Sequence, residues 1–279
     1  MDQALTGSLG RGLHLLSVLA QAASPLGLSE LTARCGFGKA TTHRLARTLL
    51  DFGFLSQDPL SRRYRLGVRV LDLGFAYLSG LDVREQALPY MHQLVHEFSE
   101  SVSLSMLDGP DVVYIERLRA GTLRVGIEVH VGTRIPAHCS SMGKALLAWL
   151  PLEQRRQLLE ARPLVALTPN TITDLEQLEA ELARVRERGF AINDEEMALG
   201  LRSTAAAIRN HDGWPVAALN AAVATARVSR AELEHRVAPR VAQCAAAISA
   251  QLGFSPSATS TTPAAAGPPA RPSPSGSRA

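Results

Sequence analysis

The sequence predicts two folded domains, a small helical domain followed by a larger α+β domain, and a C-terminal tail that stays disordered. At 279 residues the chain is longer than one hydrophobic core usually serves. Amphipathic helical segments dominate the first 80 residues, whereas strand-like and helical segments alternate beyond residue 100. Residues 255–279 are rich in Pro, Ala and Ser and lack aromatic and acidic residues, so burial cannot offset the cost of ordering them.

Two helices are predicted at the start of the helical domain. Apolar residues recur at helical spacing from Leu9 to Ala20, and the segment 24–27 then breaks the pattern. Ser29 is placed to cap a short second helix that ends at Cys35, because its hydroxyl can accept a hydrogen bond from an otherwise unpaired amide.

A third helix is predicted for residues 39–52, after a turn that contains two glycines. One face is apolar and is formed by Leu45, Leu49 and Phe52. The rest of the helix is free and begins with short hydrogen-bonding groups and guanidinium groups, which suit base edges in a DNA major groove. The candidates for base contact are Thr41, Thr42, His43, Arg44 and Arg47.

Two short strand-like stretches, 54–57 and 62–66, flank turn-forming residues and predict a β-hairpin. Its arginines, together with a lysine at the start of the third helix, are better placed to contact phosphates, which supply affinity but not sequence choice. The candidates for phosphate contact are Lys39, Arg62, Arg63 and Arg65.

The charge distribution favours DNA binding over a simpler interpretation, in which the third helix and the hairpin are merely polar because they face solvent. Residues 1–80 hold nine Lys or Arg against five Asp or Glu, whereas residues 81–254 hold eighteen against twenty-one. The order of helix, helix, glycine turn, helix and basic hairpin within the most basic segment predicts a winged helix-turn-helix domain over residues 1–67.

A linker helix is predicted over residues 68–82, and the α+β domain follows over residues 83–254. Its strands are predicted at 101–107, 111–118, 123–131, 201–209 and 216–224. Its helices are predicted at 83–97, 141–150, 152–161, 174–188 and 229–252.

Several classes of protein are excluded by the sequence. No apolar run approaches the length of a membrane span, and the first ten residues do not resemble a secretory signal, so we expect a cytoplasmic protein without a membrane partner. Three cysteines far apart fit neither a disulfide framework nor a zinc cluster.

No catalytic, metal or cofactor site is predicted, so we do not expect an enzyme. His138 and Cys139 are adjacent, and on a strand they would point to opposite faces. His92 and His96 share a helix face but lack a third metal ligand. The acidic cluster 194–196 is expected to face solvent.

Several motifs give the chain a resemblance to a known family. They are residues 8–13 (SLGRGL), 41–45 (TTHRL), 131–148, 194–203, 217–220 and 227–234. With these motifs the chain resembles the IclR family of bacterial transcription regulators over roughly residues 8–253. They are most similar to the branch that regulates aromatic-acid breakdown through the β-ketoadipate pathway.

The resemblance implies properties that the residue pattern does not. These are a GAF-like effector-binding domain, a homodimer joined mainly through the DNA-binding halves or a dimer of dimers (a homotetramer), and double-stranded DNA with a pseudo-palindromic operator as partner. A small organic acid would control operator binding, with the protein acting as repressor or activator. The alternative from another functional class is an enzyme or ligand-binding module whose basic N-terminus serves another purpose.

The resemblance also places an effector pocket on ten residues. They are Arg124, Ile127, Ile135, Ser141, Met142, Asn193, Leu201, Ser203, Asn220 and Ala222. Ser141 would open the helix 141–150, whose first amides could receive a carboxylate, and the apolar members would form walls. Asn193 stands where related members carry an acid. From the residues alone, Ser141 as a helix cap and Met142 and Leu201 as core remain open.

Overall fold

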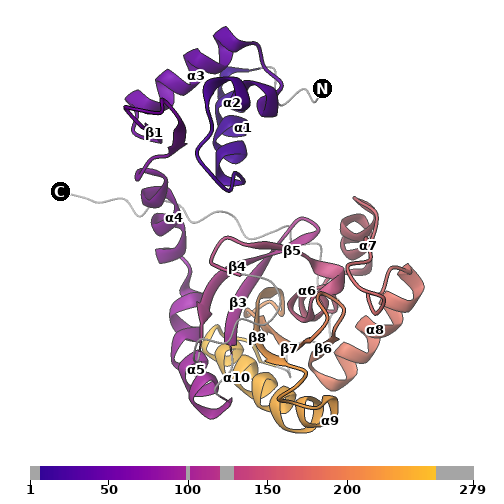
Figure 1. Ribbon diagram of the computed structural model, residues 1–279. Coiled ribbons are helices and arrows are strands. Elements are labelled where there is room, and N and C mark those ends of the chain that lie inside the picture. Colours follow the sequence, from indigo (N-terminus) through magenta and orange to yellow (C-terminus); the bar gives the residue numbers. More distant parts are fainter. Residues whose placement is uncertain (1–6, 99–100, 120–128, 256–279) are drawn as a thin grey trace, which may run out of the picture. The chain divides into compact units, whose positions relative to one another are not determined.

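The computed structural model describes residues 7–98, 101–119 and 129–255, and it divides into two compact units at Gly80 and Leu81 (Figure 1). The predicted tail lies outside the described residues except for Ser255, as does most of the predicted strand 123–131. The prediction of a separate linker over residues 68–82 stays a prediction. Within the described residues, no helix has the length and hydrophobicity needed to cross a membrane.

The N-terminal unit contains helices and a small antiparallel hairpin, as predicted. Its elements are α1 (Ser8–Ala20), α2 (Leu28–Cys35), α3 (Lys39–Asp51), β1 (Leu55–Gln57), β2 (Tyr64–Leu66) and α4 (Val70–Ser79). Strands β1 and β2 pair with Leu55 opposite Leu66. Helices α1, α2 and α3 and the hairpin share one core, formed by Leu15, Leu19, Leu26, Leu31, Cys35, Leu45, Ala46, Leu55 and Tyr64.

Two local predictions about this unit are wrong. Ser29 does not cap α2, because the cap is Gly27, two residues earlier, and the Glu30 carboxylate accepts the Gly27 N–H at 2.7 Å. Phe52 does not pack with Leu45, because α3 ends at Asp51 and the Phe52 side chain is 60% exposed. A helix that ends one residue sooner turns its last predicted core residue into a surface residue.

The C-terminal unit is built on an antiparallel sheet, which in the described residues has six strands in the order β5-β4-β3-β8-β7-β6. The strands are β3 (Ser101–Asp108), β4 (Asp111–Leu118), β5 (Arg134–Pro136), β6 (Ala191–Asp194), β7 (Leu201–Arg209) and β8 (Pro215–Ala224). The sequence did not predict β5 and β6, which have only three and four residues and form the two edges of the sheet.

Helices cover both faces of this sheet (Figure 1). They are α5 (Asp82–Phe98), α6 (Ser141–Leu147), α7 (Leu152–Glu160), α8 (Leu175–Arg188), α9 (Arg230–Glu232) and α10 (Ala238–Gln251), with a 3₁₀ turn at Ala137–Cys139 and a π turn at Leu233–Val237. Helices α5 and α10 pack on one face, and α6, backed by α8, packs on the other. Because side chains alternate along a strand, every second residue of β3, β7 and β8 points toward α6.

Candidate functional site

Helix α3 presents a basic, exposed face, as the sequence predicted. Lys39, His43, Arg44 and Arg47 are exposed and Thr41 is partly exposed. Arg47 forms an exposed ion pair with Asp51 one turn later, at 3.2 Å. Helix α3 is held by its other face against α1 and α2, so its polar side is free to enter a groove.

The prediction that Thr42 contacts bases is wrong. Thr42 is fully buried, and its hydroxyl donates to the Gly38 carbonyl at 3.3 Å. It lies three and four residues before Leu45 and Ala46, on the same helix face, so it belongs to the packing stripe. The spacing itself contains this signal, which the polar character of threonine obscures.

The hairpin is organised by Asp58 at its turn. The Asp58 carboxylate accepts hydrogen bonds from the Leu60 and Ser61 amides and from the Ser61 hydroxyl. The bond from the Ser61 amide is the main reason why the pKa of Asp58 lies below its usual value. Arg62 adopts a positive φ of 57° at the end of this turn. The turn therefore fixes the point at which the arginine-bearing segment of the hairpin begins.

The three hairpin arginines differ in their contacts. Arg62 and Arg65 are exposed, and Arg65 Nε donates to Ser56 across the hairpin at 3.0 Å. Arg63 instead donates to the Pro25 carbonyl at 2.7 Å and forms an ion pair with Glu30 at 3.0 Å. Arg63 therefore ties the hairpin to the start of α2, a structural role that the sequence analysis did not foresee.

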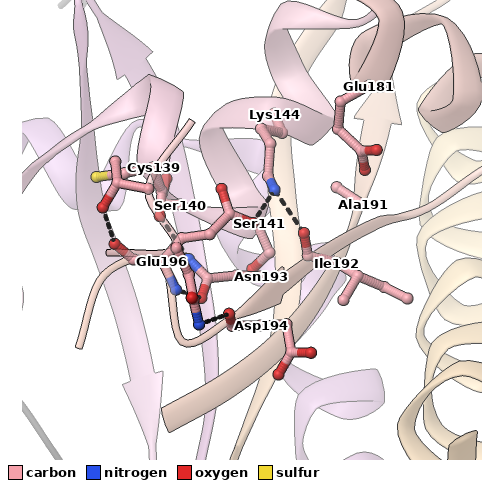
Figure 2. A network of polar contacts seen from close by, with 12 residues as sticks. Cys139, Ser140, Ser141, Lys144, Glu181, Ala191, Ile192, Asn193, Asp194 and Glu196 are labelled. Carbon is pink, nitrogen blue, oxygen red and sulfur yellow. Dashed lines mark hydrogen bonds and ion pairs between the residues drawn. The ribbon is translucent and has the colours of Figure 1, made fainter. Parts of the chain in front are cut away.

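In the C-terminal unit, several predicted effector residues meet where α6 packs on the sheet. The Oγ atoms of Ser141, on α6, and Ser203, on β7, lie 2.8 Å apart and are hydrogen-bonded. Ser203 is directly opposite Asn193 of β6 and Ala222 of β8, so these side chains share the face beneath α6. Four of the ten predicted residues thus converge on one small area (Figure 2 shows its Ser141 and Asn193 side).

Helix α6 is capped by Ser140 and not by Ser141. Ser140 Oγ accepts the Gly143 N–H at 3.0 Å, and the helix has seven residues, ending three residues earlier than predicted. A side chain at Gly143 would collide with the backbone of Ala137, so glycine is required at this position. Since one first-turn amide is already bonded, the helix start offers a carboxylate less than the sequence analysis expected.

The Asn193 side chain connects two backbone segments of the C-terminal unit by hydrogen bonds. Its side-chain nitrogen donates to the Cys139 carbonyl, and its side-chain oxygen accepts the Glu196 N–H at 3.2 Å (Figure 2). The end of β6 is thereby tied to the residue that precedes the cap of α6. Its contact with an effector stays a prediction.

A buried ion pair beside the Asn193 hydrogen bonds was not predicted from the sequence. Lys144, on α6, is fully buried and donates to the Ile192 carbonyl at 2.6 Å and to Glu196 at 2.5 Å (Figure 2). Burial raises the pKa of Glu196, and the neighbouring Lys144 opposes that rise. The expectation that all of 194–196 faces solvent is therefore wrong for Glu196, which locks the turn after β6 to α6.

The remaining predicted pocket residues are buried or lie outside the described residues. Ile135 and Met142 belong to the core under α6, and Leu201 is buried on β7. Asn220 Oδ1 accepts the backbone N–H of Ser103 at 3.0 Å. Arg124 and Ile127 lie outside the described residues.

The side chains that could have suggested catalysis are not arranged for it. His138 and Cys139 lie in a 3₁₀ turn and not on a strand, and His138 Nε2 lies 3.1 Å from the Val165 carbonyl. Burial raises the pKa of Cys139 to about 12, which keeps the thiol protonated. Among the described residues no group of three His, Cys, Asp or Glu side chains could hold a metal ion.

Comparison with known protein families identifies the family to which this chain belongs. The IclR helix-turn-helix domain matches residues 8–59, and the C-terminal domain of the bacterial transcriptional regulator IclR matches residues 75–250. This chain belongs to the IclR family. The predicted family and the two-domain fold are confirmed, and the IclR-family protein is a transcriptional regulator and not an enzyme.

Individual relatives agree with this assignment. The chain is 32% identical to the HTH-type transcriptional regulator XynR of Escherichia coli over 88% of this chain and 97% of that protein. It is 35% identical to the Pca regulon regulatory protein of Pseudomonas putida over 85% of this chain and 83% of that protein. A crystal structure of an IclR homologue complexed with 4-hydroxybenzoate, from Microbacterium hydrocarbonoxydans, matches with a TM-score of 0.75 and 26% identity over 88% of this chain and 99% of that one.

Proposed function

We propose that this IclR-family protein binds a pseudo-palindromic operator and that a small aromatic acid, bound beneath α6, controls that binding. The observation that carries the proposal is the group of buried hydroxyl and amide side chains where α6 meets the sheet, formed by Ser141 on α6 and Asn193, Ser203 and Asn220 on the sheet, beside the apolar core. Polar groups placed in a core are costly unless they are paired, and they are what orients a polar ligand.

For DNA, the exposed face of α3 would read bases and the hairpin would contact phosphates. Thr41, His43, Arg44 and Arg47 occupy the exposed face of α3. Lys39, Arg62 and Arg65 are exposed cations at its start and on the hairpin. Arg63 supports the hairpin through Pro25 and Glu30, and Thr42 is left out of the interface because it is buried.

For the effector, two relatives point to the same chemistry. One regulates a Pca regulon, and a structural relative was crystallised with 4-hydroxybenzoate. A hydroxybenzoate has a carboxylate and a hydroxyl on one flat ring, which suits a site that offers serine hydroxyls at the edge of an apolar core. The position of the protein in aromatic-acid breakdown rests on this likeness.

The assembly is proposed to be a homodimer, alone or paired into a dimer of dimers. Helix α4 buries none of its residues, and Leu71, Leu73, Phe75 and Tyr77 are all more than half exposed. A hollow of about 300 Å³ between α1 and α3 is lined mainly by leucines, among them Leu9 and Leu13, with Arg44 and Thr48 on its α3 side. A second copy that covers the apolar side chains of α4 and α1 and leaves Arg44 exposed would remove these side chains from water and place two copies of α3 on two operator half-sites.

One experiment tests the regulatory proposal as a whole. Retention of the purified protein on its own promoter DNA is measured by fluorescence anisotropy at several salt concentrations, with and without 4-hydroxybenzoate, protocatechuate and β-ketoadipate. We expect binding that falls steeply with salt and shifts with at least one acid, since only differential affinity for two states can switch a protein. Salt-independent binding, or binding that no acid changes, would contradict the proposal and favour the ligand-binding module.

A variant links this response to the site under α6. Ser141→Ala removes the hydroxyl that pairs with Ser203 and is expected to weaken the acid response without changing operator affinity in the absence of acid. Ser61→Ala, on the exposed hairpin turn, removes a hydroxyl in the other unit and should leave the acid response intact. A full response in Ser141→Ala would place the effector elsewhere.

A further inference from the structure

The sheet face beneath α6 carries a second row of polar side chains, next to the row that contains Ser203. In this second row Arg117 of β4 lies opposite Ser103 of β3, and Ser103 lies opposite Asn220 of β8. Residues opposite one another share a face, so all three point toward the α6 side of the sheet. Neither the family resemblance nor the pattern analysis had singled out Arg117.

Arg117 is a half-buried cation without an acidic partner in the part of the chain that the structure describes. Its Nη1 donates to Ser103 Oγ at 3.3 Å, and its Nε is buried without a hydrogen-bond acceptor. The neighbouring carboxylate, Glu116, follows the alternation of the strand to the opposite face and pairs with Arg84 of α5 at 2.7 Å. The guanidinium therefore has an unused donor, Nε, on the sheet face that carries the proposed effector site.

The electrostatics agree with this geometry. Burial lowers the pKa of Arg117, and the charge of Arg119 lowers it further. Arg119 itself donates to the Val129 carbonyl at 2.7 Å and adds positive charge nearby. A half-buried guanidinium in this position destabilises the ligand-free fold, and an anion would relieve both the desolvation and the repulsion.

We infer that Arg117 is the cation that binds the carboxylate of the effector, in a site whose far end is the Ser141 and Ser203 hydroxyl pair. The inference rests on the proposed effector site and names the group that selects acids there. The carboxylate would accept hydrogen bonds from the Arg117 guanidinium, whose Nε has no acceptor, and Ser103 would hold the guanidinium in place. Ser105, whose buried hydroxyl has no partner, lies next along β3 on the same face.

The register of the sheet also limits the size of the ligand. Ser103 and Ser203 are on β3 and β7, which are separated by β8, and they are offset by two residues along the strands, so their Cα atoms lie roughly 12 Å apart. A single aromatic ring with a carboxylate and a hydroxyl on opposite carbons reaches from one end to the other. A two-carbon oxo acid would contact one end only. The site thus suits 4-hydroxybenzoate better than a short keto acid.

The test compares a charged ligand with its neutral counterpart. Binding of 4-hydroxybenzoate and 4-hydroxybenzamide to the full chain is measured by isothermal titration calorimetry for the wild type, Arg117→Met and Arg117→Lys. We expect the wild type to bind the acid roughly 10- to 100-fold more tightly than the amide, the difference that a hydrogen bond to a charged group provides. Arg117→Met should lose this preference, and Arg117→Lys should recover part of it.

Two controls separate ligand binding from folding. Arg156→Met removes an exposed arginine of the same unit, on α7, and should leave the preference for the acid unchanged. The ligand-free melting temperature of Arg117→Met should equal or exceed that of the wild type, because the variant no longer buries an unpaired charge. A structural role for Arg117 predicts the opposite, a lower melting temperature.

The outcomes also separate this inference from the proposed function. If Arg117→Met keeps the preference for the acid, or if the wild type binds acid and amide equally or neither of them, the inference about Arg117 is overturned. An acid that binds through Arg117 but leaves operator affinity unchanged would support the inference and overturn the proposed regulation. An acid that releases the operator equally well from wild type and Arg117→Met would support the proposed regulation and overturn the inference about Arg117.

Discussion

At their candidate sites, the two units of this IclR-family protein place positively charged side chains in opposite environments, exposed in the first unit and buried in the second. On α3 and the hairpin, Arg44 and Arg65 are exposed and need no carboxylate beside them, because water solvates them. Under α6, Lys144 is fully buried and is matched by Glu196 and the Ile192 carbonyl. The comparison teaches that an exposed cation is available for a partner by default, whereas a half-buried cation such as Arg117, whose Nε has no acceptor and which has no acidic partner among the described residues, is a candidate for binding an anion.

The largest effect is expected from breaking the buried pair. Lys144→Met leaves the Glu196 carboxylate buried and alone, and this should lower the free energy of unfolding by about 3 to 5 kcal/mol. Urea denaturation followed by circular dichroism measures it. The double variant Lys144→Met, Glu196→Gln should recover much of the loss. A loss below about 1 kcal/mol in the single variant would mean that burial does not determine how much this ion pair contributes to the free energy of unfolding.

The next effect concerns base reading. Arg44→Ala should leave the fold unchanged, since the side chain is exposed, but should relax operator preference by about 1 to 3 kcal/mol at one base pair. Competition of operator and mutated operator duplexes in an anisotropy assay gives this difference. Arg34→Ala serves as the matched control, because it removes an exposed arginine of α2 that is not assigned to the DNA interface. Equal loss for every duplex would show that Arg44 contacts phosphate instead.

A smaller and sequence-independent effect is expected on the hairpin. Arg65→Ala should weaken all duplexes alike and reduce the slope of log affinity against log salt by about 1, as for one lost phosphate contact. Titrations at several salt concentrations measure the slope. Arg63→Ala should instead lower the melting temperature of the N-terminal unit, because its bonds to Pro25 and Glu30 are internal. Reversed behaviour of the two arginines would refute this division.

The smallest effect is expected for Thr42. Thr42→Val keeps the shape of a buried side chain and removes one hydroxyl whose acceptor, Gly38, already accepts the backbone N–H of Thr42 at 3.0 Å. Operator preference should therefore not change, and the free energy of unfolding should change by at most about 1 kcal/mol. The same competition assay decides it. A change in base preference would return Thr42 to the interface and break the contrast between buried and exposed positions.

The elements that the sequence predicted well are those with a strong local pattern. The helix that became α3 was placed to within one residue because its apolar spacing and its preceding glycine turn are local signals. The short edge strands β5 and β6 were missed because three or four residues carry too little periodicity. The start of α6 at Ser141 was predicted correctly, but its cap could not be decided from the sequence, because two adjacent serines give the same local signal.

The candidate site was predicted less completely, for a different reason. Resemblance placed Ser141, Asn193 and Ser203 in one site, and the sheet does bring them together. Arg117 carries no local signal, because an arginine on an alternating strand looks like any surface cation. Only the register of β4 against β3, and the face to which Glu116 turns, show that Arg117 points inward.

The sequence by itself determined the family, the two-domain plan and the basic surface of the first domain. These depend on composition, periodicity and motifs, which are properties of residues close to one another along the chain. Only the tertiary structure decided which polar side chains are buried, that Thr42 packs, that Lys144 pairs with Glu196 and that Arg117 has no acidic partner among the described residues. The physical reason is that desolvation depends on what packs around a side chain, and the packing residues lie far apart in the chain.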